Sequence, residues 1–152
     1  MGSAQSPAKQ LAGFIDKFDP AIARLIRSCR AALLRRFPAA IEMVYDNYNF
    51  FVIGFGPSER ASECIVSMTA NAKGVGLCFI HGAKLPDPHG ILLGNGTQTR
   101  FIRLERAADL MNPEVEALFL AALAQAKVPL PATGKGYVVI KSVSAKQRPR
   151  RA

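Results

Sequence analysis

The sequence is poor in the residues that most often mark a reaction centre. Its 152 residues include no tryptophan, two histidines and three cysteines, and no two cysteines form a C-x-x-C pair. With two histidines, a serine, cysteine or threonine nucleophile has few partners, and no catalytic triad is recognisable. We expect Cys29, Cys64 and Cys78 to be small buried hydrophobic residues in a reducing compartment, the cytoplasm. The sequence gives no positive sign of an enzyme and favours a non-enzymatic protein.

Long apolar runs are also missing. The longest stretch of large apolar residues lies around residues 50–53, whereas a membrane span needs about 20 such residues. Residues 1–10 contain no apolar segment of the kind that a secretory signal requires. We therefore expect neither a secretory signal nor a contact with the membrane.

Acidic residues are few, with 11 Asp and Glu against 20 Lys and Arg and a formal net charge of +9. Such a field repels free cations at long range, and the acids are scattered, with Asp16 and Asp19 the closest approach to a ridge. His81, Asp87 and His89 lie in a loop rich in proline and glycine, without helical spacing. We interpret these three as exposed polar residues, and predict no metal site and no cofactor.

The composition that remains, 49% hydrophobic and 20% charged, is that of a globular chain long enough to form one domain. We divide it into a flexible N-terminus at residues 1–8, a folded domain at residues 9–142 and a basic C-terminal tail at residues 143–152. No internal repeat and no second domain is visible.

Hydrophobic spacing predicts three helices and a run of short strands. Helices are expected at residues 6–18, 20–36 and 113–127, and strands at residues 42–46, 50–55, 63–70, 75–80, 99–104 and 137–141. Short turn-like connections between the strands favour an antiparallel meander over a parallel sheet. The predicted fold is a single-domain α+β fold, in which an antiparallel β-meander sheet is packed by N-terminal and C-terminal helices.

Several of these strands are apolar on both faces. Phe50 and Val52 would lie on one face of their strand, and Phe51 and Ile53 on the other. A sheet with one face in water should alternate. We expect a helix to cover the second face, with a second copy of the chain or an apolar ligand as the alternatives.

The most distinctive segment is GNGTQTRFIRL at residues 94–104, a glycine turn that leads into a strand. No Lys-Ser or Lys-Thr follows the glycines and no helix begins there, so the segment is not a phosphate loop. We expect the two glycines to provide positive φ angles.

With its neighbours, this segment resembles the YdhG-like family, small bacterial domains of unknown function of which some are described as frataxin-like iron chaperones. The resemblance covers residues 11–128 and rests on Glu42, the passage YDNYNF at 45–50, the hairpin GVGL at 74–77 and the turn that ends in Thr99-Arg100. It implies an antiparallel sheet backed by helices. The sparse acidic residues disfavour the iron-chaperone role for this chain.

A ligand site is predicted where the aromatic passage and the glycine-turn arginines would converge. Its candidate residues are Glu42, Tyr45, Tyr48, Phe50, Arg100 and Arg103. Arg100 shares a strand face with apolar residues, so it needs an acidic partner or an edge; we expect an ion pair with Glu42, with anion binding as the alternative.

Basic residues gather on the outer face of the second helix and in the tail, which is the pattern of a nucleic-acid contact. The candidates are Arg24, Arg27, Arg35, Lys146, Arg148, Arg150 and Arg151. We expect the tail to lie apart from the folded core, because it is polar and follows the last apolar strand.

Two functions follow as hypotheses. The first is a small cytoplasmic, non-enzymatic binding domain of the YdhG-like type, whose partner is an unidentified small ligand or protein, including a second copy of the chain. The alternative is a basic accessory protein that binds nucleic acid weakly through its tail and the arginine-rich helix face.

Overall fold

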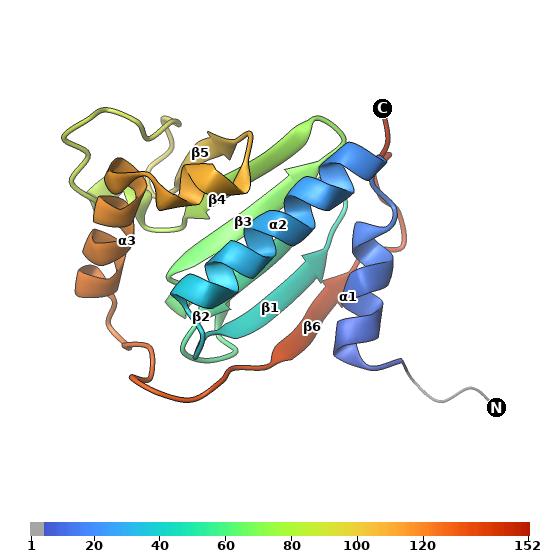
Figure 1. Cartoon of the computed structure of the whole chain (residues 1–152), viewed down its shortest axis with the longest axis horizontal. Helices are drawn as coiled ribbons and strands as arrows, with labels where there is room; N and C mark the ends of the chain where they lie inside the picture. Colours follow the sequence, from blue (N-terminus) through green and yellow to red (C-terminus); the bar gives the residue numbers. More distant parts are fainter. Residues whose placement is uncertain (1–4) are drawn as a thin grey trace.

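The fold is a six-stranded sheet with all of its helices on one face (Figure 1). The computed structural model describes residues 5–152. The helices are α1 (Pro7–Ile15), α2 (Pro20–Arg36) and α3 (Pro113–Gln125), with short 3-10 turns η1 (Ala61–Glu63), η2 (Gly82–Lys84) and η3 (Ala107–Met111). The strands are β1 (Ile41–Asp46), β2 (Phe51–Gly56), β3 (Val66–Asn71), β4 (Gly74–Phe79), β5 (Arg100–Leu104) and β6 (Val138–Val143). The predicted α+β architecture is confirmed.

The strands follow the order β5-β4-β3-β2-β1-β6, and the first five form the expected antiparallel meander. The last strand differs, because β6 pairs with β1 in parallel, with a register shift after Val44. The chain returns from α3 across the start of β1, where Gly136 donates its N–H to the carbonyl of Pro38. A Cβ on Gly136 would lie 1.7 Å from the carbonyl oxygen of Ala40, so this crossing requires glycine.

The core lies between the helices and the sheet. α2 packs on β3 and β4, while α1 packs on β6. Phe51 receives the rings of Phe14 and Phe18 edge-on, and Phe119 of α3 contacts the ring of Phe79. The predicted packing of the second and last helices on the sheet is confirmed.

The expectation that a helix covers the second face of the sheet is wrong. Alternate residues of β3 and β4 are only half-buried on this face, among them Thr69 and Cys78. The connection from β2 to β3 covers part of the face, where Cys64 lies against Gly54. Phe50 precedes β2 in a turn and does not share a strand face with Val52.

Candidate ligand-binding cleft

The six residues predicted to form one ligand site do not converge. Glu42 and Tyr45 lie on β1, whereas Arg100 and Arg103 lie on β5. β2, β3 and β4 separate these two strands, which places them about 19 Å apart at about 4.8 Å per strand. Tyr48 and Phe50 occupy the exposed turn between β1 and β2.

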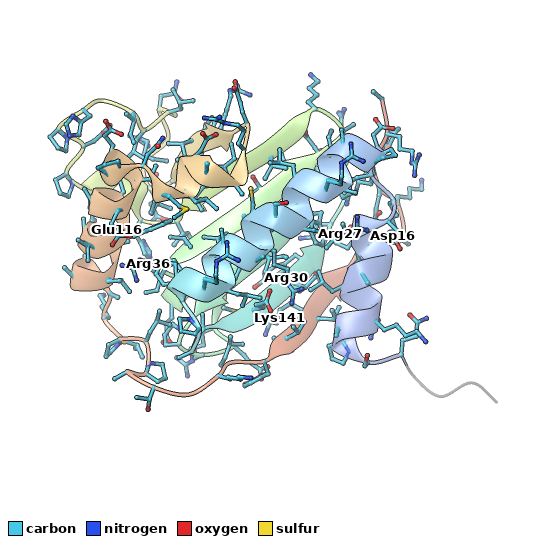
Figure 2. The ribbon with its side chains drawn as sticks, viewed as in Figure 1. Asp16, Arg27, Arg30, Arg36, Glu116 and Lys141 are labelled. Carbon is cyan, nitrogen blue, oxygen red and sulfur yellow. The ribbon has the colours of Figure 1, made fainter. Side chains whose placement is uncertain are left out.

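The expected ion pair between Glu42 and Arg100 is wrong. Glu42 is buried and accepts two hydrogen bonds from Arg30 of α2, at 2.6 and 2.8 Å. Figure 2 labels Arg30 beside α2, in front of the sheet. These bonds raise the pKa of Arg30 and fix the pair as a bidentate link between helix and sheet. Arg100 instead donates to the carbonyl oxygens of Gly96 and Thr99, and so fastens its own glycine turn.

Of the two glycines predicted to have positive φ angles, one does. Gly94 has a φ of 112°, in the region that favours glycine, whereas the φ of Gly96 is not positive. Asp87 accepts hydrogen bonds from the N–H groups of Ile91 and Leu92, both at 3.0 Å, and so orders the loop before the turn. Across residues 5–152 no cluster of three His, Cys, Asp or Glu side chains could hold a metal ion.

The basic candidates divide into several groups. On α2, Arg27 pairs with Asp16 of the segment before the helix (Figure 2), whereas Arg24 and Arg35 are exposed. Arg24 and Arg35 are about 16 Å apart at about 1.5 Å per helical residue. Arg24 and Arg35 therefore do not form one compact patch with each other.

The expectation that the tail lies apart from the core is wrong. Arg150 is 5% exposed and donates to the carboxylate of buried Asp46 at 2.9 Å. Lys17 binds the other oxygen of the same carboxylate at 2.7 Å, and the Arg150 guanidinium lies over the ring of Phe18. Arg150 thus serves as a core residue and cannot reach a phosphate. Its Nε and Nη1 have no hydrogen-bond partner among the described residues.

A cleft opens at the opposite end of the fold, where the end of β4 meets the C-terminus of α3. Its volume is about 370 Å³. The floor is apolar and consists of Cys64, Ile65, Phe79 and Ala122, all of them buried. η1, β4 with the residues that follow it, and α3 each contribute one wall.

His81 holds the rim of this cleft together. One of its ring nitrogens, Nε2, lies 3.2 Å from the carbonyl oxygen of Ser62, and its own carbonyl accepts from Gln125 at 3.3 Å. The segment after β4 is thereby tied to η1 on one side and to α3 on the other. In both contacts a side chain bonds to a backbone carbonyl, and together they fix the mouth of the cleft.

The charges at the rim favour an anion. Lys84 and Lys127 are exposed and form no salt bridge among residues 5–152. The opposing charge is Glu63, which accepts a hydrogen bond from Ser58 at 2.6 Å. The C-terminus of α3 adds about half a negative charge. Two lysines still outweigh these two contributions.

The chemistry inside the cleft suits binding. Burial raises the pKa of the Cys64 thiol to about 11, so this thiol is neutral at physiological pH and a weak nucleophile. An apolar floor with a few polar groups at one end is the usual form of a small-molecule site.

The cleft contains none of the six residues that the sequence predicts as a ligand site. The cleft residues come from three segments between positions 62 and 128, and none of those segments carries a motif. His81 is exposed, as the sequence predicts, but its bonds to Ser62 and Gln125 depend on the fold and have no signal in the sequence. Comparisons of the chain with family models, curated proteins and solved structures found no match. None of the helices described is long and apolar enough to cross a bilayer.

Proposed function

We propose that this chain is a cytoplasmic, non-enzymatic binding domain of the YdhG-like type, and that its cleft holds a small molecule with an apolar body and an acidic group. The observation that carries the proposal is the apolar floor beneath Lys84 and Lys127, two lysines without salt bridges among the described residues. The three cysteines are unpaired thiols, which supports a reducing compartment.

The size of the cleft supports a ligand of metabolite scale. Its volume of about 370 Å³ lies near the lower end of the range for small-molecule sites, about 300–1,000 Å³. Burial of an apolar ligand body against Ile65 and Phe79 would contribute about 25 cal/mol for each Å² removed from water. The lysines then discriminate between ligands of the same shape by charge.

Three probes of equal chain length separate the apolar and the charged contributions. Hexanoate, hexanol and hexylammonium are titrated into isotope-labelled protein, and amide chemical shifts are followed by NMR. We expect hexanoate to bind most tightly and hexylammonium most weakly, with shifts confined to residues 62–65, 79–84 and 122–128. A difference of about tenfold between hexanoate and hexanol corresponds to about 1.4 kcal/mol from the charge.

Two variants test the location. Ser62→Trp places a large ring at the mouth and should abolish the shifts, while Lys84→Gln with Lys127→Gln should remove only the preference for hexanoate. Lys73→Gln, in the exposed β3–β4 hairpin, is the matched control. Equal binding of hexylammonium and hexanoate, or shifts outside the cleft, would refute the proposal.

A further inference from the structure

The β1–β2 turn and the C-terminal tail form one ordered surface at the end of the molecule away from the cleft. Arg148 donates its backbone N–H to the carbonyl of Tyr48 at 2.9 Å, and Arg150 donates to the carbonyl of Asn47. Gln147 donates to the backbone carbonyl of Asp46 at 2.7 Å. These bonds hold the backbone of the tail beside the turn, so Lys146 and Arg148 are attached to an ordered segment.

This surface presents aromatic rings next to cations. Tyr48 is 49% exposed and Phe50 is 45% exposed, so both rings can be reached from solvent. The Arg148 guanidinium lies 5.9 Å from the centre of the Tyr48 ring. Lys146 and Arg148 are exposed and have no salt bridge within residues 5–152. We call Tyr48, Phe50, Lys146 and Arg148 the turn–tail surface.

The acidic groups nearby are already engaged. Asp46 is buried between Lys17 and Arg150, and Asp16 pairs with Arg27. Asp19 accepts a hydrogen bond from the N–H of Ala152. The two outward cations of the turn–tail surface are therefore left to bind an anion from solution.

We propose that the turn–tail surface binds single-stranded nucleic acid. Bases stack on Tyr48 and Phe50, and the phosphates between them contact Lys146 and Arg148. Exposed rings beside basic side chains are the arrangement by which proteins bind single strands without sequence preference. A duplex keeps its bases stacked on one another, so it could use the two cations but not the two rings.

A membrane surface fits these residues less well. Binding to a bilayer interface requires a broad apolar face, usually that of an amphipathic helix with basic flanks. The turn–tail surface offers two rings on a hydrogen-bonded turn, one of them with a phenol hydroxyl. Anionic lipid nevertheless enters the test as a competing ligand.

The test is a fluorescence-anisotropy titration of the full chain with a labelled oligothymidylate of about 15 nucleotides. Tyr48→Ala and Phe50→Ala should each weaken binding by about five- to a hundredfold, since stacking contributes about 1–3 kcal/mol per base. Arg148→Gln should reduce the salt dependence: the log–log slope falls from about −1.4 to about −0.7 as one of two phosphate contacts is lost.

Matched controls keep the result specific. Tyr137→Ala removes an exposed tyrosine just before the start of β6. Arg35→Ala removes an exposed arginine near the C-terminus of α2, and Ser62→Trp blocks the cleft. All three should bind the oligonucleotide as the wild type does. Tighter binding to a duplex of equal length, binding only to phosphatidylserine vesicles, or equal affinity in every variant would each overturn the proposal.

Discussion

The two ends of the molecule use cations in opposite ways. At the tail end, Lys17 and Arg150 bind the buried carboxylate of Asp46. At the cleft end, Lys84 and Lys127 stand over an apolar cavity and pair with nothing in the described chain. The excess of basic residues therefore has two origins: some cations hold the fold, and others are available to ligands.

The same division separates neighbours in the tail. Arg150 is buried and Arg148, two residues earlier, is exposed over Tyr48. A count of charges treats them as equal, although one satisfies a buried acid and the other faces water. Removal of the first should cost stability, and removal of the second should cost only binding.

Arg150→Ala gives the largest expected effect. It leaves the carboxylate of Asp46 in the core with Lys17 as its one charged partner and uncovers the ring of Phe18. Loss of one partner from a buried pair typically costs about 3–5 kcal/mol; because Lys17 remains, we expect about 3 kcal/mol. Urea denaturation followed by circular dichroism measures the loss. Arg148→Ala is the control and should change the free energy of unfolding by no more than about 0.5 kcal/mol.

An effect of similar size for both arginines would show that the tail contributes packing as a whole and that Asp46 does not depend on Arg150. The division between structural and available cations would then be wrong at the tail end.

Acid should destabilise the protein through Asp46 at the tail end. Burial alone would raise the pKa of Asp46, but the hydrogen bonds from Lys17 and Arg150 outweigh it and hold that pKa below its usual value. A group whose pKa is lower in the folded state than in the unfolded state stabilises the fold at a pH above its unfolded-state pKa, which is near 4 for Asp. This stabilisation is lost as the pH falls through the folded-state pKa. Each unit of difference between the two pKa values contributes about 1.4 kcal/mol to the free energy of unfolding.

Asp46→Asn removes this contribution. Its free energy of unfolding should lie below that of the wild type at pH 7, and the two curves should approach one another below about pH 4. Asp16→Asn, which alters an exposed pair with Arg27, should follow the wild-type curve. A constant gap between Asp46→Asn and the wild type down to pH 2 would contradict the proposed role of the carboxylate.

The rim lysines should give the smallest change in stability. Because Lys84 and Lys127 form no salt bridge in the described chain, their replacement by glutamine should alter the free energy of unfolding by less than about 0.5 kcal/mol each. Thermal unfolding of the double variant checks this. A loss above about 2 kcal/mol would assign these lysines to the fold and remove them from the cleft's ligand chemistry.

The sequence was sufficient for the parts of the fold that depend on local patterns. The apolar stripe of α2 and the short turns of the meander predicted their packing and pairing, because helical and strand periodicity are local. The parallel pairing of β6 with β1 was not predictable in this way. It depends on a crossing at Gly136 and on a register set by residues almost a hundred positions apart.

The functional site was harder still to predict from the sequence. Arg30 follows Cys29 at the edge of the apolar stripe of α2, and from this position an arginine can reach the sheet. Nothing in the sequence, however, selects Glu42 as its partner over the other acidic residues. Arg150 looks like part of a solvated basic run, and its burial depends on Asp46 of a distant strand. The cleft forms only where three segments that are distant in the sequence meet, so no single sequence pattern predicts it.

The most direct measurement is a pair of NMR titrations on one labelled sample, first with hexanoate and then with the oligothymidylate. Hexanoate should shift amides at residues 62–65, 79–84 and 122–128, and the oligonucleotide should shift amides at residues 46–50 and 145–151. Each affinity should be unchanged by the other ligand, because the two sites share no residue. Overlapping sets of shifted amides, or competition between the two ligands, would contradict the separation of the cleft from the turn–tail surface.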